Sequence, residues 1–97
     1  MFNDKTLQGR TAIVTGGGTG LGLSMAKKFA DLGANLVITS RDPAHTEPAC
    51  EDLRSRGVKA LAVRCDVRNF AEVEAMVEEA HTTFGSVDIL INNAAGN

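Results

Sequence analysis

The residues best suited to chemistry are the glycines of segment 15–22, whose sequence is TGGGTGLG. They follow the spacing Gly16-x-x-x-Gly20-x-Gly22 between a short β-branched run and an amphipathic segment. Glycine lets a chain turn tightly and approach an anion closely, and a helix that starts there offers unpaired N–H groups. Leu23 excludes two other glycine motifs, because a P-loop needs lysine there and G-x-G-x-x-G needs glycine. The segment therefore predicts a phosphate cradle, and the alternative is a tight connection without a ligand.

Polar residues follow the other apolar runs at the points where each run ends. They are Ser40–Asp42 after the second run, Asp66–Arg68 after the third, and Asn92–Asn93 after the fourth. If the runs are parallel strands of one sheet, their carboxyl ends meet at one edge, which is where such sheets bind ligands. We therefore expect these residues to share a rim with the glycine segment.

The composition removes several other chemistries. The 97 residues include no tyrosine, so no phenolic acid or base within them can act. Cys50 and Cys65 are too few and too isolated for a disulfide framework or a zinc site, and we expect reduced thiols used for packing. His45 and His81 match no motif and are expected to be exposed or packing residues. The sequence thus offers no catalytic and no metal-ligating residue.

Charge and hydropathy limit the partners. The formal net charge is −2 and the pI is about 5.6, which argues against nucleic acid or an anionic membrane as a partner. No apolar run approaches the roughly 18 residues of a membrane span, and the start lacks the apolar stretch of a signal peptide. We therefore expect a soluble, cytoplasmic protein.

The apolar pattern alternates short runs with helical periodicity. It predicts strands over 11–15, 36–39, 60–65 and 87–91, and helices over 20–32, 47–56 and 69–84. The second helix is expected to begin after a Thr46 cap, with Pro48 in its first turn, and the third to begin at an Asn69 cap. The apolar stripe of the first helix is Leu21, Met25, Phe29 and Leu32, and that of the third is Phe70, Val73, Met76, Val77, Ala80 and Phe84.

The order β-α-β-α-β-α-β predicts an α/β fold. Such alternation implies a Rossmann-type parallel sheet with right-handed crossovers and helices on both faces. Strands without strict alternation of polar and apolar residues fit burial on both sides. No linker or close repeat interrupts the chain, so we expect one domain or part of one.

Two motifs together resemble the short-chain dehydrogenase/reductase family. Segment 15–22 matches T-G-x-x-x-G-x-G, and the segment from Asn92 to Gly96 is similar to N-N-A-G with one additional alanine. The resemblance spans all 97 residues and implies an NAD(P)-dependent oxidoreductase on a single Rossmann-type domain longer than this chain. It implies that residues 1–97 are the N-terminal, cofactor-binding part and that the C-terminal catalytic part, with its Tyr-x-x-x-Lys pair, is absent.

The resemblance also implies how the cofactor lies. The pyrophosphate would be wrapped by segment 16–22, the adenine would border Asp66 and Val67, and the ribose would lie along Asn93 and Ala94. The residues expected to bind the cofactor are Gly16, Gly18, Thr19, Gly20, Leu21, Gly22, Arg41, Asp66, Val67, Asn93, Ala94 and Ala95.

The end of the second strand indicates which nicotinamide cofactor is bound. An NAD site places a carboxylate there to accept from the ribose hydroxyls, whereas a 2′-phosphate needs a cation. That position holds the neutral Ser40, and Arg41 follows it, which favours NADP(H). Asp42 is the alternative carboxylate, and Arg41 can instead be a solvated surface arginine.

The additional alanine is similar to the pattern of one subgroup, the 2,4-dienoyl-CoA reductases. In that subgroup the counterparts of Arg68, and partly of Arg41, face the coenzyme A phosphates, although Arg68 can equally be a surface residue at a helix start. The resemblance therefore implies an NADPH-dependent reductase of an unsaturated (dienoyl or enoyl) or carbonyl acyl-CoA, active as a homo-oligomer. The alternative is a non-catalytic nucleotide-binding module. We expect the 97 residues alone to be inactive and, through an open strand edge, to self-associate.

Overall fold

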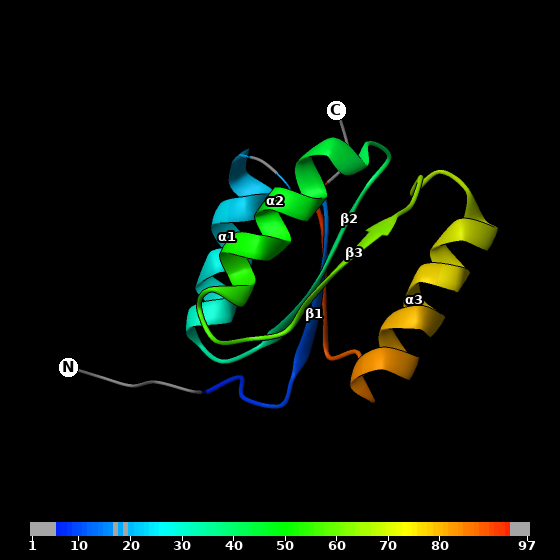
Figure 1. Cartoon of the computed structure of the whole chain (residues 1–97). Coiled ribbons are helices and arrows are strands. Elements are labelled where there is room, and N and C mark those ends of the chain that lie inside the picture. The colour runs from blue at the N-terminus through cyan, green and yellow to red at the C-terminus, as the bar shows by residue number, and fades with distance from the viewer. Residues whose placement is uncertain (1–5, 17, 19, 94–97) are drawn as a thin grey trace.

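The computed structural model describes residues 6–16, 18 and 20–93. Strands and helices alternate throughout this part of the chain (Figure 1). In chain order they are β1 (Thr11–Thr15), α1 (Gly20–Asp31), β2 (Asn35–Ser40), α2 (Pro43–Arg54), β3 (Ala60–Arg64), α3 (Phe70–Phe84) and β4 (Ile89–Asn92).

The strands form a parallel sheet in the order β3-β2-β1-β4. Figure 1 shows α1 and α2 side by side against one face of this sheet and α3 against the other. The predicted Rossmann-type α/β fold is confirmed. Because β1 pairs with both β2 and β4, all five of its residues are buried.

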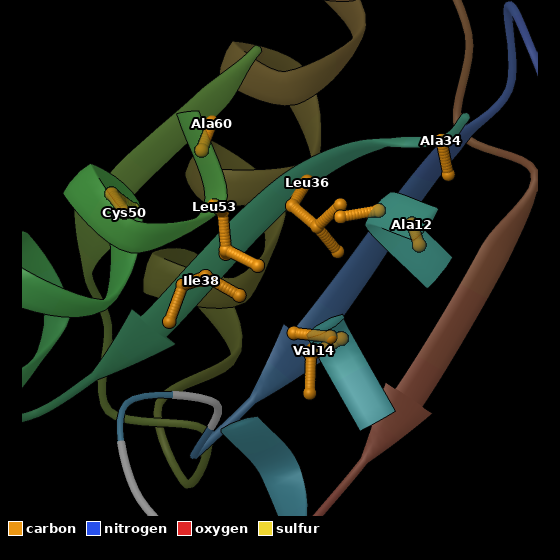
Figure 2. Close-up of a cluster of buried hydrophobic side chains, with 10 residues drawn as sticks. Ala12, Val14, Ala34, Leu36, Ile38, Cys50, Leu53 and Ala60 are labelled. Carbon is orange, nitrogen blue, oxygen red and sulfur yellow. The ribbon is translucent and has the colours of Figure 1, made fainter. Parts of the chain in front are cut away.

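Two hydrophobic clusters hold the three layers together. The first joins α1 and α2 to the sheet, and Figure 2 shows its side chains gathered around Leu36 and Ile38 of β2 and Leu53 of α2. The second joins α3 to the opposite face through Ile13, Val37, Cys65, Met76 and Ala80. Alternate residues of β1 and β2 thus enter opposite clusters, which is why these strands lack a polar face.

The buried face of α1 differs from the predicted one. Its fully buried residues are the small ones, Gly22, Ala26 and Ala30, whereas Leu21 is 68% exposed. Small residues at a spacing of four let the helix backbone approach the sheet closely. The predicted stripe is therefore wrong at Leu21, and Phe29 is a partly buried neighbour of the first cluster.

Helix α2 begins four residues before the predicted start. Asp42, and not Thr46, caps it by accepting a hydrogen bond from the Ala44 N–H at 2.9 Å. Pro43 occupies the first turn, where its missing N–H is not needed, and Pro48 lies inside the helix. Thr46 is buried at 2% exposure, within the helix rather than before it. The predicted start was wrong because it placed Pro48 in the first turn of the helix, whereas Pro43 occupies that turn.

Helix α3 has the predicted bounds. Asn69 caps its start by accepting from the Glu72 N–H at 3.2 Å, and Gly85 ends it in the left-handed conformation. Met76 and Ala80 are buried as expected, but Phe70, the first residue of the helix, is 75% exposed and lies outside the second cluster. None of the helices in the described part of the chain has the length and hydropathy needed to span a membrane.

Candidate nucleotide-binding site

The carboxyl ends of the four strands share one end of the molecule (Figure 1). Hydrogen bonds join the segments that follow them: the Gly16 N–H donates to the Thr39 carbonyl at 2.7 Å, and the Cys65 N–H donates to the Ser40 carbonyl at 3.0 Å. The predicted rim therefore exists, and the first residue of the glycine loop is held against the end of β2.

The glycine loop turns through conformations that favour glycine. Gly16 has φ 66° and Gly20 has φ 58°. Gly22 is buried, and a Cβ there would collide with the Gly16 carbonyl oxygen and would lie 2.7 Å from Asn93 Nδ2. The first turn of α1 thus contacts both the start of the loop and the residue after β4. This close approach requires glycine at position 22.

Thr15 ties the asparagine pair to the end of β1. Its hydroxyl donates to Asn92 Oδ1 at 3.1 Å and accepts from the Asn93 N–H at 2.8 Å. Because Thr15 is 3% exposed, water does not compete well for these hydrogen bonds. The hydroxyl of Thr15 therefore fixes where Asn93 lies relative to the glycine loop.

A hollow of about 390 Å³ lies between the loop, the end of β2 and the start of α2. Its lining consists of Gly16, Gly18, Gly20, Leu21, Ser40, His45 and Asn93. The described lining contains no carboxylate, so bare backbone, an imidazole and side chains without a charge face the hollow. These groups fit the phosphates of a dinucleotide.

His45 was expected to have no part in this site. It lies in the first turn of α2, and a Cβ on Gly18 would come within 3.0 Å of its backbone carbonyl. The sequence signal that could have located it is the Asp42-Pro43 pair, which starts α2 early enough to bring His45 to the rim. His81, by contrast, lies on α3 at the opposite face of the sheet.

The end of β2 has a neutral hydroxyl followed by a cation and a carboxylate. Ser40 Oγ accepts from the Asp42 N–H at 3.1 Å, and the Asp42 carboxylate is occupied as the cap of α2. Within residues 6–16, 18 and 20–93, Arg41 is exposed and forms no ion pair within 4.0 Å. Its guanidinium is therefore available to an anionic ligand.

Asp66 and Arg68 pair with each other at the end of β3. Arg68 Nε donates to one carboxylate oxygen of Asp66 and Nη2 to the other, each at 3.0 Å. These hydrogen bonds, together with that from the Arg68 N–H, lower the pKa of Asp66 to about 2. The Glu72 carboxylate accepts from the Asp66 N–H at 2.9 Å, so the turn is fixed from the side of α3.

The remaining candidate residues are Thr19, Val67, Ala94 and Ala95. Val67 is half-buried beside Asp66, while Thr19, Ala94 and Ala95 lie outside the described residues. Cys50 and Cys65 are free and buried, and burial raises the pKa of the Cys50 thiol to about 11, as expected of packing residues. No cluster of potential metal ligands is found among the residues whose positions are described.

The sequence profile described as short chain dehydrogenase matches residues 10–97. The chain belongs to the short-chain dehydrogenase family.

Several proteins of known name are similar to this short-chain dehydrogenase chain. It is 36% identical, over 99% of its length, to the peroxisomal 2,4-dienoyl-CoA reductase of Arabidopsis thaliana, and 43% identical, over 91%, to oxidoreductase UcpA of Salmonella typhimurium. The crystal structure of a hydroxysteroid dehydrogenase from Escherichia coli has a TM-score of 0.88 and 37% identity over 93% of this chain. The alignments cover 32%, 33% and 38% of those three proteins, so this chain spans about a third of each relative.

Proposed function

We propose that this chain is the cofactor-binding part of an NADP(H)-dependent reductase acting on an unsaturated (dienoyl or enoyl) or carbonyl acyl-CoA. The family membership supports a nicotinamide cofactor and an oxidoreductase activity. The observation that carries the assignment is the close approach of Gly22 to Gly16 and Asn93, two residues that line the hollow. This approach leaves no room for a side chain at position 22. When bound, the nicotinamide supplies or accepts the hydride.

Within this site the chain binds and orients the cofactor. Residues Gly16, Gly18, Gly20, Leu21 and Gly22 would hold the pyrophosphate, and Thr19 is proposed with them. Asn93, fixed by Thr15, would border the ribose together with Ala94 and Ala95, and Asp66 and Val67 would border the adenine. The Asp66 carboxylate keeps acceptor capacity beyond its pairing with Arg68 because each oxygen has more than one lone pair.

The unpaired Arg41 supports NADP(H) over NAD(H). A 2′-phosphate gains charge-assisted hydrogen bonds from a guanidinium, whereas the ribose hydroxyls of NAD need a carboxylate. Ser40 supplies no charge, and the Asp42 carboxylate, the alternative acceptor, is held at the start of α2 as its cap by the hydrogen bond from the Ala44 N–H. Arg41 therefore gives the site a preference for the phosphorylated ribose.

The acyl-CoA substrate is proposed on the similarity to a 2,4-dienoyl-CoA reductase. Arg68, with its side chain 73% exposed, and Arg41 are the cations at this rim that could meet coenzyme A phosphates. The chain has no tyrosine, so we propose that proton donation comes from residues outside these 97 and that the chain alone does not turn over. The alternative is a non-catalytic nucleotide-binding module. Substrate turnover by a longer chain that contains these residues would exclude it.

We further propose a homo-oligomer in the cytoplasm, with neither nucleic acid nor membrane as a partner. The two free, buried cysteines fit a reducing compartment. The net charge of −2 gives no electrostatic attraction to nucleic acid or to an anionic membrane.

Calorimetric titration of the chain with 2′,5′-ADP and with 5′-ADP tests the cofactor assignment, because the two ligands differ in the 2′-phosphate. We expect 2′,5′-ADP to bind on the order of tenfold more tightly, since a hydrogen bond to a charged group contributes about 1.5–3 kcal/mol. Arg41→Gln should remove the difference, and Lys28→Gln, which removes an exposed cation from the last turn of α1, should preserve it. Equal affinities in the wild type would overturn the NADP(H) assignment.

A further inference from the structure

His45 is an unassigned side chain at the mouth of the proposed cofactor site. It lines the hollow together with Gly16, Gly18 and Ser40. The residue is exposed, and within the described part of the chain its imidazole has no hydrogen bond or ion pair. An imidazole has two nitrogen atoms that can donate or accept, and at this position both are open to a ligand.

Packing of the backbone fixes the place of His45. A Cβ on Gly18 would lie 3.0 Å from the carbonyl carbon, the carbonyl oxygen and the Cβ of His45, so the loop and the first turn of α2 are in direct contact. The start of α2 is set by the Asp42 cap. The backbone of His45 is therefore held at the rim by the fold, and α3 with its acidic residues lies on the opposite face of the sheet.

Charges of both signs lie close to His45 in the chain, whereas the hollow itself is lined by no carboxylate among the described residues. On its own side are Arg41, which is unpaired, and Asp42, whose carboxylate accepts the Ala44 N–H. Glu47, further along α2, pairs with Arg54 at 3.3 Å. The described residues of the glycine loop carry no charge, and neither does the first turn of α1. Arg41, whose positive charge also acts on Asp66, is therefore the nearest cation to His45 in the chain, and the capping carboxylate of Asp42 is the nearest anion.

We propose that His45 is a specificity-determining residue that donates to the 2′-phosphate of NADP(H) together with Arg41. This inference rests on the proposed function and adds a pH-dependent contact to it. Imidazole side chains gain a positive charge between pH 8 and pH 5, whereas a phosphate monoester remains mostly dianionic down to about pH 6. Between pH 8 and pH 6.5 the preference for the phosphorylated cofactor should therefore rise.

The test is the affinity of the chain for NADP⁺ and for NAD⁺, measured by calorimetry between pH 8 and pH 6.5. We expect the ratio of the two affinities to rise by on the order of threefold as the pH falls, which is the size of an exposed ion-pair contribution. His45→Gln, which can still donate a hydrogen bond but cannot gain charge, should give a flat ratio. His45→Asn provides a second uncharged variant, and circular dichroism reports whether each variant is folded.

His81→Gln is the matched control, because it removes the other histidine of the chain from α3 on the opposite face. It should keep the wild-type pH dependence. The inference is overturned if His45→Gln and His45→Asn keep that dependence while NADP⁺ is still preferred, and the proposed function then stands. If neither cofactor binds the wild-type chain, both fail together.

Discussion

Replacing Gly22 by alanine tests the cradle most directly. The new Cβ would overlap the Gly16 carbonyl oxygen, lie 2.7 Å from Asn93 Nδ2 and lie 3.0 Å from the Gly16 carbonyl carbon. Two of these three atoms are backbone, so the loop itself has to move. Overpacking of this kind costs about 1–3 kcal/mol, against a gain of about 0.5–1 kcal/mol for alanine in a helix. We expect a net loss of about 1 kcal/mol in the free energy of unfolding.

The effect on ligand binding should be larger than the effect on stability. Moving the loop misaligns backbone N–H groups, and losing even one hydrogen bond to a charged phosphate lowers affinity at least about tenfold. Urea denaturation followed by circular dichroism gives the stability, and calorimetry with NADP⁺ gives the affinity. Ser24→Ala, two residues further along α1 and exposed, should gain helix propensity and leave binding unchanged. A Gly22→Ala chain that binds NADP⁺ as tightly as the wild type would refute the cradle.

Three further perturbations follow from the same geometry. Thr15→Val removes the hydroxyl that holds the asparagine pair and should lower the free energy of unfolding, measured in urea, by about 1–2 kcal/mol. Thr39→Val is the control and should not lower it, because Thr39 Oγ1 is buried without a hydrogen-bond partner in the described structure. The pKa of Asp66 is lowered to about 2 by its hydrogen bonds with Arg68. The contribution of its carboxylate to stability is therefore present above about pH 4 and is lost as the pH falls toward 2. An NMR titration of this carboxyl group with a midpoint near pH 4 would contradict this. The wild-type chain should self-associate through the outer edge of β4, where Leu90 is 59% exposed. Leu90→Lys should reduce the mass measured by light scattering. A wild-type chain that is monomeric at high concentration would contradict this.

The helices and strands could be predicted from the sequence wherever the apolar pattern of a segment coincides with the face that neighbouring elements bury. The buried strands are short β-branched runs ending at polar residues or glycine, and α3 carries both its Asn69 cap and its Gly85 stop. The start of α2 was missed because the effect of Pro43 depends on the Asp42 cap beside it. The exposure of Phe70 could not be predicted either, since periodicity does not say where a packed face ends.

The position of the candidate site could be predicted because its residues follow the carboxyl ends of the strands. The glycine spacing and the asparagine pair locate the rim because parallel strands bring their carboxyl ends together. The place of His45 at the rim depends on the early start of α2, which the Asp42-Pro43 pair signals, and on the contact between Gly18 and α2, a tertiary distance that the sequence does not give. The pairing of Asp66 with Arg68 likewise depends on side-chain conformations within the turn.

The contact of Asn93 with Thr15 and Gly22 has a consequence for how the site comes into being. Thr15 and Asn93 are 78 residues apart, and β1 cannot complete its pairing until β4 is in place. A nascent chain that ends between residues 22 and 93 already contains the whole glycine loop but lacks the amide that lies against it. Contacts of such long sequence separation form late, because closing the loop costs entropy first. During synthesis, the ability to hold a dinucleotide should therefore be acquired in one step, when β4 joins the sheet.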